Sequence, residues 1–127
     1  MKLRIKGDSL RLRVSRSELA RLLQGDRIEE TAHFAAAPEA RLTYALESAI
    51  DSAPVRVEYG SRGLTVILSE EQLGIWGLEK EVGVYSTLDI GGDRSLEVIV
   101  EKDFSCLDRE GEENDDTFRN PHEGVAC

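Results

Sequence analysis

The sequence predicts an α+β fold made of two ββαββ units, which together form an eight-stranded antiparallel sheet or a closed barrel with two helices on one face. The first observation is that residues 2–25 contain two alternating strands, a turn and a helix, and that the same order returns 54 residues later (15 to 69). The second is a pair of capping-box sequences at this offset, Ser15 with Glu18 and Ser69 with Gln72. The third is that the same offset aligns apolar residues with apolar residues without a gap.

The first unit, residues 1–54, opens with a hairpin whose strands alternate between apolar and basic residues. Alternation with a period of two residues is typical of a half-buried strand, and Gly7-Asp8-Ser9 supplies turn chemistry. A capped helix follows, and Pro38 marks the connection between the third and fourth strands because proline cannot donate to strand pairing. We expect strands at residues 2–6 and 10–14, a helix at 15–24, and strands at 27–34 and 42–48.

The second unit, residues 55–103, repeats this order, and Gly91-Gly92-Asp93 closes its last hairpin. Its helix contains two glycines, each of which costs about 1 kcal/mol relative to alanine, so packing must hold the helix. We expect strands at residues 55–59 and 64–68, a helix at 70–78, and strands at 82–90 and 96–101. The offset is expected to continue through the last two strands, so that Ile28 corresponds to Val82.

The chain of 127 residues fits a single domain, residues 1–127, with pseudo-repeats at 1–54 and 55–103. The alternating pattern ends there, and residues 104–127 form an irregular acidic segment. The segment contains apolar residues that a free tail would not need, namely Phe104, Cys106, Leu107 and Phe118. We therefore expect this segment to pack along the body of the domain, with its acidic centre, residues 110–116, looping out.

The net charge of −9 is distributed unevenly. Residues 1–27 carry eight Lys and Arg against three Asp and Glu, whereas residues 101–127 carry nine Asp and Glu against three Lys and Arg. Such asymmetry indicates an interaction surface or a tail that folds back on the body. No run approaches the ~20 apolar residues of a membrane span, and no apolar leader follows Met1, so we expect a cytoplasmic protein without membrane contact.

Basic residues gather on the polar side of the expected sheet. Arginine and lysine suit phosphate or carboxylate groups, and the planar arginine fork binds two oxygens at once. The candidate anion-binding residues are Lys2, Arg4, Lys6, Arg11 and Arg13, with Arg41 and Arg56 from neighbouring strands.

Two interpretations of this basic face remain open. In the first, the face binds a phosphate-containing small molecule or an acidic protein. In the second, the protein's own acids neutralise it, through the acidic C-terminal segment and through cross-strand pairs with Glu29, Glu58, Glu97 and Glu101. Nucleic acid is not expected as a partner, because the net charge is −9 and no aromatic residues alternate with the bases for stacking.

Cys106, His122 and Cys127 are candidate zinc ligands in the C-terminal segment, with His33 as a fourth candidate. Thiolate and imidazole are the ligands that structural zinc prefers, but the paired cysteine knuckle of strong zinc motifs is missing here. The same cysteines could instead be reduced thiols or form a disulfide. No catalytic motif is found in the sequence, so we expect a protein that is not an enzyme.

Taken from Leu10, the strand order β-α-β-β-β resembles the duplicated unit of the triphosphate-tunnel (CYTH-like) fold. That resemblance implies a closed barrel lined with arginine and lysine that holds a triphosphate, and metal-dependent phosphohydrolase activity. The family's first strand carries E-x-E-x-K, and residues 2–6 read KLRIK. Lys6 matches this motif, whereas Lys2 and Arg4 stand where the family has its metal-binding glutamates.

The whole sequence also resembles a small group of uncharacterised bacterial proteins, through KLRIKGDSLRLRVSRSE, EKDFSCLDR and FRNPH. This second resemblance implies that the two ends of the chain belong together, and it carries no known activity. We therefore expect a binding protein for an anionic ligand or acidic partner. The alternatives are a divergent tunnel-type triphosphate phosphohydrolase and an interaction scaffold whose tail is held by zinc.

Overall fold

The computed structural model describes residues 1–51, 53–61, 63–104 and 116–118. The order of its elements is ββαββ followed by ββαββ, as the sequence predicts. The elements are β1 (Lys2–Ile5), β2 (Ser9–Val14), α1 (Arg16–Leu23), β3 (Ile28–His33), β4 (Arg41–Ala49), β5 (Val55–Gly60), β6 (Gly63–Ser69), α2 (Glu70–Trp76), β7 (Gly83–Gly91) and β8 (Arg94–Lys102).

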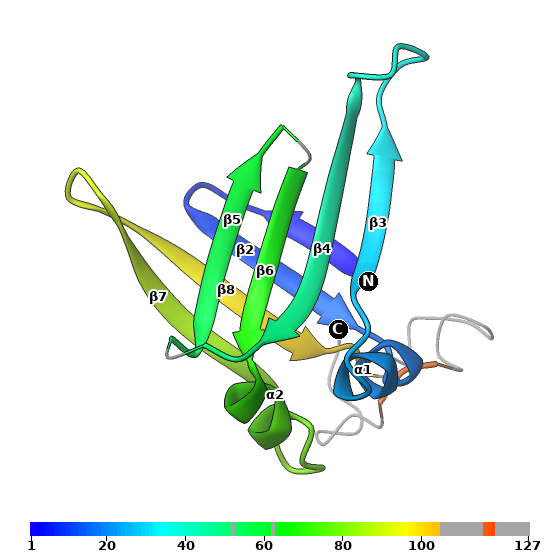
Figure 1. Ribbon diagram of the computed structural model, residues 1–127, viewed down its shortest axis with the longest axis vertical. Coiled ribbons are helices and arrows are strands. Elements are labelled where there is room, and N and C mark those ends of the chain that lie inside the picture. The colour runs from blue at the N-terminus through cyan, green and yellow to red at the C-terminus, as the bar shows by residue number, and fades with distance from the viewer. Residues whose placement is uncertain (52, 62, 105–115, 119–127) are drawn as a thin grey trace.

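The strands form two four-stranded mixed sheets that lie face to face with their strands crossing (Figure 1). Sheet A has the order β1-β2-β8-β7, and sheet B has the order β3-β4-β6-β5. The prediction of one eight-stranded antiparallel sheet or a closed barrel is therefore wrong. In the described part of the chain no hydrogen-bonded strand pair joins the two sheets, so each sheet keeps two free edges.

Each sheet combines hairpins from both units. The hairpins themselves are antiparallel, whereas the central pairs, β2 with β8 and β4 with β6, are parallel. A helix separates the two hairpins of each unit and carries the chain from one sheet to the other, so the neighbour of β2 comes from the second unit. Turn residues specify the hairpins, but alternation says nothing of which hairpins meet at the centre of a sheet.

The two central pairs have the same register under the 54-residue offset. Leu10 pairs with Val98 in sheet A, and the equivalent Leu64 pairs with Tyr44 in sheet B. The two central pairs therefore have matching registers, and the internal repeat itself stays a prediction.

The 54-residue offset does not hold in β7, however. Val100 pairs with Val84 and not with Val82. Val84 is buried like Ile28, whereas Val82 is 37% exposed. The predicted equivalence of Ile28 with Val82 is therefore wrong by two residues, because the connection from α2 to β7 is two residues longer than that from α1 to β3.

The core lies between the sheets and at the end where the two helices sit. Most of its strand residues come from the central strands, and Ile28, Val55 and Val84 come from edge strands. Trp76 of α2 is fully buried, with its indole N–H donating to the carbonyl oxygen of Val82 at 3.2 Å. The largest fully buried aliphatic side chains are Leu12, Leu22, Leu46 and Leu68. Burial of apolar surface at about 25 cal/mol per Å² is the main force that holds the sheets together.

The helices close one end of the sandwich (Figure 1), and the expectation that they cover one face of a sheet is corrected accordingly. The apolar faces are buried sheet against sheet, which leaves the helices only the open end. α1 has the full capping box: the Ser15 hydroxyl accepts from the Glu18 amide at 3.3 Å, and the Glu18 carboxylate accepts from the Ser15 amide at 2.9 Å. In α2, within the described residues, only the serine half is formed, by Ser69.

No helix in the described residues is long and apolar enough to cross a membrane.

Candidate functional site

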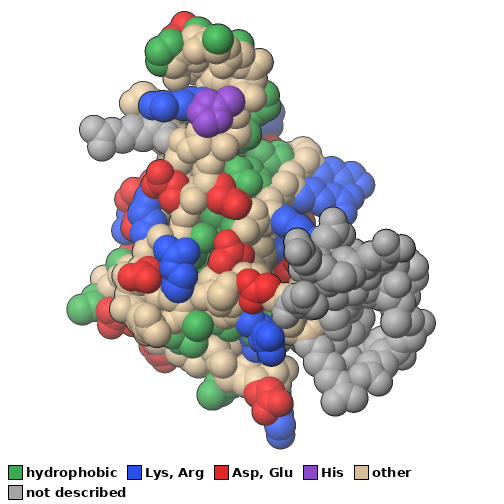
Figure 2. Space-filling view, turned by 90° about the vertical axis from the view of Figure 1, so that its right-hand side faces the viewer, with side chains coloured by type: hydrophobic (Ala, Val, Ile, Leu, Met, Phe, Trp, Pro, Cys, Tyr) green, Lys and Arg blue, Asp and Glu red, His purple; other side chains and the backbone are tan. Residues whose placement is uncertain are grey.

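Five of the predicted basic residues lie together on the outer face of sheet A. Lys2 pairs with Arg13 and Arg4 pairs with Arg11 across β1 and β2, and Lys6 follows in the adjoining turn. These side chains point outward because the alternate residues of β2 are buried in the core. We call Lys2, Arg4, Lys6, Arg11 and Arg13 the basic stripe. In Figure 2, Lys and Arg side chains project from this side of the molecule, whereas acidic and basic side chains alternate over sheet B.

Arg41 and Arg56 do not belong to this surface, and the prediction that placed them beside it is wrong. They lie on β4 and β5 of sheet B, separated by β6. Alternation correctly gives them an outward direction but cannot say which sheet a strand joins. Arg56 is paired with Asp51 at 2.9 Å and with Glu58. Hydrogen bonds to these two carboxylates, that of Asp51 first, raise the pKa of Arg56.

Glu101 of β8 binds two arginines of the basic stripe. Its carboxylate lies 2.8 Å from Nε of Arg13 and 3.5 Å from Nε of Arg11, and the glutamate side chain is only 13% exposed. The contact follows from the parallel pairing of β2 with β8, which puts Arg13 opposite Glu101. Internal neutralisation of the basic face, one of the two interpretations of the sequence, therefore holds for part of the stripe.

Lys2 has a partner as well, because its Nζ lies 3.1 Å from the carboxylate of Asp103. Arg4 and Lys6 differ. Both side chains are exposed, and neither forms an ion pair with any residue that the structure describes. Among the described residues, three of the five cations therefore share two carboxylates, Glu101 and Asp103. Glu97, another acid on this face, lies beside Ser9 in the next row of the sheet, and Asp89 lies on edge strand β7.

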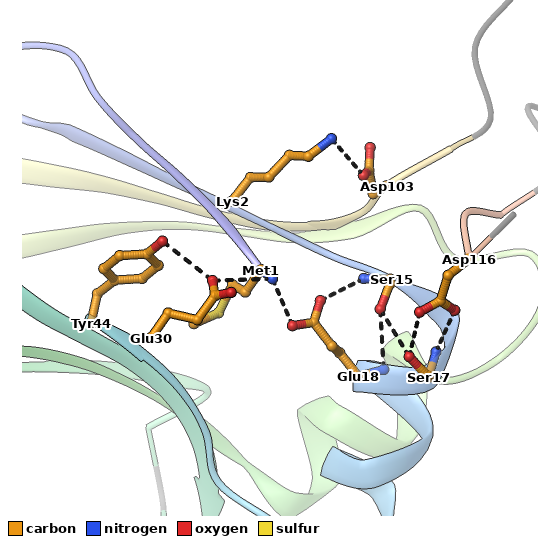
Figure 3. A network of polar contacts seen from close by, with 9 residues as sticks. All are labelled: Met1, Lys2, Ser15, Ser17, Glu18, Glu30, Tyr44, Asp103 and Asp116. Carbon is orange, nitrogen blue, oxygen red and sulfur yellow. Dashed lines mark hydrogen bonds and ion pairs between the residues drawn. The ribbon is translucent and has the colours of Figure 1, made fainter. Parts of the chain in front are cut away.

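At the α1 end of the stripe, a polar pocket of about 390 Å³ adjoins Lys2 and Arg13. Figure 3 shows the polar contacts around it. The pocket is lined by Met1, Lys2, Arg13, Ser15, Ser17, Glu18, Asp103, Asp116 and Thr117. Three cationic groups and three carboxylates balance one another there.

The amino group of Met1 is buried between the margins of the two sheets. It lies 2.6 Å from the Glu18 carboxylate and 3.2 Å from that of Glu30, and the Tyr44 hydroxyl donates to Glu30 at 3.2 Å (Figure 3). Burial, followed by the charge of Glu30, raises the pKa of Tyr44. Sequence reasoning missed this cluster. Its one signal was Glu30 itself, an acid on the side of its strand that holds Ile28 and Ala32.

Asp116 binds the N-terminus of α1. Its carboxylate accepts from the Ser17 amide at 3.1 Å and from the Ser17 hydroxyl, and its carbonyl accepts from the Arg16 amide at 3.2 Å. The Ser17 hydroxyl is the main reason that the pKa of Asp116 is lowered. The sequence led us to expect that Asp116 would loop out, and this expectation is wrong. The rest of that acidic stretch, residues 110–115, lies outside the described residues.

Phe104 and Phe118 pack against the body, as predicted, whereas Cys106 and Leu107 lie outside the described residues. The two phenylalanine rings meet edge to face at 6.0 Å, and the Phe118 amide donates to the Asp103 carbonyl at 2.8 Å. Beside them, Nζ of Lys102 donates to the Leu78 carbonyl at 2.8 Å and lies 5.3 Å from the centre of the Phe118 ring. Burial lowers the pKa of Lys102, and the charges of Glu81 and Glu79 oppose this shift.

A family of unknown function (DUF7009) has a family model that matches residues 1–122 of the chain. The chain belongs to this family. No curated protein and no solved structure matches the chain. The expectation of an uncharacterised family is thus confirmed, while the bacterial origin stays an expectation. The DUF7009 match spans both ββαββ units together with the region of Asp116 and Phe118, which return to the body of the fold.

The zinc hypothesis for this DUF7009 protein falls on residues that the structure does not describe, because Cys106, His122 and Cys127 all lie outside the described ranges. Among the residues that are described, no group of three or more His, Cys, Asp and Glu side chains could hold a metal ion.

Proposed function

We propose that the basic stripe binds an acidic, extended segment of a partner protein. The observation that carries this proposal is the uneven pairing of the stripe: Arg4 and Lys6 have no ion-pair partner among the described residues, while Lys2, Arg11 and Arg13 share two carboxylates. A second set of carboxylates from outside the chain would complete the pairing. Because Arg4 and Lys6 are exposed on the edge strand and in its turn, such a partner has free access to both.

The shape of the surface favours an extended partner over a small molecule. Sites for small ligands are concave and enclose most of their ligand. The stripe lies instead on the outer face of two paired strands, where successive outward side chains are about 6.6 Å apart. Carboxylates that recur along a peptide match this spacing better than the compact charge of one phosphate group. The pocket beside Lys2 and Arg13 does not favour phosphate either, since Glu18, Asp103 and Asp116 line it.

The fold does not favour the alternative function, that of a tunnel-type phosphohydrolase. That activity needs cations that line the inside of a closed barrel, whereas here the apolar faces point inward and the stripe lies outside.

Glu101 fixes the positions of two arginines of the basic stripe. By holding Arg11 and Arg13 in place, the largely buried carboxylate competes with a partner for these two arginines. Arg4 and Lys6 then supply the free charge. Binding of this kind is electrostatic and surface-exposed, so we expect modest affinity that falls steeply with salt.

The test is fluorescence anisotropy of a labelled decaglutamate peptide titrated with the protein at low and at high salt. We expect saturable binding at low salt. The double variant Arg4→Gln/Lys6→Gln should bind about tenfold more weakly, because each exposed ion pair is worth up to about 1 kcal/mol. Tripolyphosphate, added as a competitor, reports whether a compact anion occupies the same surface.

The matched control is Arg41→Gln/Lys80→Gln, which removes the same charge from exposed positions outside the stripe. This control should leave affinity close to that of the wild type. Absence of binding at millimolar peptide in low salt, or equal loss in the two double variants, would overturn the proposal, since the second result indicates attraction by overall charge alone.

A further inference from the structure

Within the described ranges the two sheets have four edge strands, and three of them carry charges that discourage pairing with another chain. β1 has Lys2 and Arg4, β3 has Glu29 and Glu30, and β5 has Arg56 and Glu58. Charged residues on edge strands are a common protection against edge-to-edge association. β7 is the exception: it is the longest edge strand, with nine residues, and Asp89 near its end is its only charged residue.

The free side of β7 is also exposed. No described element lies beyond β7 in sheet A, where it forms the margin next to β8 (Figure 1). Tyr85 is 63% exposed and Ile90 is 53% exposed, and Thr87 between them is exposed too. A long edge without protecting charge or proline is a template for a further strand.

We infer that this strand is β7 of a second copy of the chain, paired antiparallel about a two-fold axis. The sequence of β7 before its bulge is complementary to itself. The regular pairing of β7 with β8 runs from Gly83 to Asp89, where the register shifts. These seven residues are centred on Ser86, so that Ser86 faces its own copy in the self-paired strand.

In this register every cross-strand pair is compatible. On the inner side, Val84 of each copy faces Leu88 of the other copy. On the outer side, Tyr85 of each copy faces Thr87 of the other copy. Aromatic and β-branched residues are favourable cross-strand partners, and apolar pairs on the inner side extend the core face. Asp89 faces Gly83, so no charge stands opposite a like charge.

A depression on the outer face can accept the Tyr85 ring of the second copy. A shallow depression of about 250 Å³ lies along β7 and β8, and its outward-facing lining residues are Tyr85, Thr87, Glu97 and Ile99. Tyr85 of the second copy, opposite Thr87, would lie across this depression with its hydroxyl toward Glu97. Main-chain hydrogen bonds along the edge would give affinity, and the paired side chains would set the register.

The resulting dimer would have one continuous eight-stranded sheet with both basic stripes on the same side. With neighbouring strands about 4.8 Å apart, the two copies of β2 would be roughly 24 Å apart. An acidic partner with two segments could then engage both stripes, which raises avidity without a new contact. The dimer itself does not depend on the proposed function of the stripe.

The test is sedimentation velocity of the full chain over a concentration series. We expect a monomer–dimer equilibrium that shifts toward dimer as salt increases, because each chain carries a net charge of −9 and salt screens the repulsion. This salt dependence is opposite to that expected for binding of the acidic peptide, so the two proposals fail or succeed separately.

Charge variants identify the interface. Tyr85→Lys/Thr87→Lys puts lysine opposite lysine twice in the proposed register and should abolish the dimer, as should Tyr85→Glu/Thr87→Glu. An equal mixture of the two variants should recover a heterodimer through opposite charges. Circular dichroism confirms that each variant is folded, and Tyr59→Lys on edge strand β5, where the tyrosine is 82% exposed, is the control that should still dimerise.

A wild-type chain that stays monomeric at millimolar concentration in high salt overturns the inference. So does a dimer that persists in both double variants, since another surface must then hold it, and so does a mixture of the two variants that stays monomeric.

Discussion

Gly63 shows how one residue fixes the start of a central strand. Its φ of +117° is rarely adopted by other residues, and a Cβ atom built there would lie 2.0 Å from the carbonyl oxygen of Thr43 on β4. β6 pairs with β4 directly beyond this point. The close approach of the two backbones therefore requires a residue without a side chain.

We expect Gly63→Ala to lower the free energy of unfolding by more than about 2 kcal/mol, measured by urea denaturation. The control is Gly7→Ala, because Gly7 also has a positive φ, +54°, but open space around its Cβ position. That variant should cost about 1–2 kcal/mol for the backbone conformation alone. Equal costs for the two variants would show that contact with Thr43 is not what demands glycine.

Ionisation of Asp116 makes the free energy of unfolding depend on pH in the acid range. Its pKa is lowered in the folded state by the hydrogen bonds from Ser17. The contribution is therefore fully present above the ordinary aspartate pKa of about 3.9 and is lost as the pH falls through the lowered value. We expect Asp116→Asn to be less stable than the wild type at neutral pH.

The difference in unfolding free energy between wild type and Asp116→Asn should shrink as the pH is lowered below about 4. Denaturation at a series of pH values measures it, with Ser17→Ala as the reciprocal control that removes the hydroxyl donor. A difference that stays constant down to the lowest pH would mean that the carboxylate charge plays no part in the contact.

At the scale of elements, the two helices hold the same position in the order of strands and helices but differ in their N-terminal stabilisation. Glu18 completes the capping box of α1 and also binds the Met1 amino group, whereas Gln72 is its equivalent in α2. Glu18→Ala removes both contacts and should cost about 1–2 kcal/mol. Glu18→Gln keeps a cap acceptor and loses only the charge, so its cost should be smaller.

Thermal or urea unfolding of these variants, with Gln72→Ala as the matched control on α2, distinguishes the two contributions. Gln72→Ala should fall within about 0.5 kcal/mol of the wild type. If it costs as much as Glu18→Ala, then helix propensity, rather than the cap and the amino group, accounts for the effect.

The pairing of β2 with β8 links the stability of sheet A to the proposed binding. Glu101→Gln removes the charge that holds Arg11 and Arg13, so we expect lower stability together with tighter binding of decaglutamate. Glu47→Gln is the control, because Glu47 is the equivalent residue of sheet B and pairs with Arg27 at 3.1 Å. Stronger binding in both variants would indicate a general effect of net charge and not competition within the stripe.

For the whole molecule, the sequence predicts the local structure well and the assembly of the sheets poorly. Turn residues, capping sequences and alternation predict, in the right order, the eight strands and two helices found in the described residues. Alternation also gives the outward direction of Arg41 and Arg56, but only the long-range pairing of strands decides that they belong to sheet B. For the same reason the sequence could not identify Glu101 as the shared partner of Arg11 and Arg13, since that contact depends on parallel pairing between the two units.

The most direct measurement is a map of amide resonances by nuclear magnetic resonance as decaglutamate is added to the isotope-labelled chain at low salt. The proposal requires saturable shifts confined to the outer face of β1 and β2, largest near Arg4 and Lys6, which disappear in Arg4→Gln/Lys6→Gln. Shifts centred on sheet B, or no shifts at millimolar peptide, would contradict the assignment of the basic stripe as the binding surface.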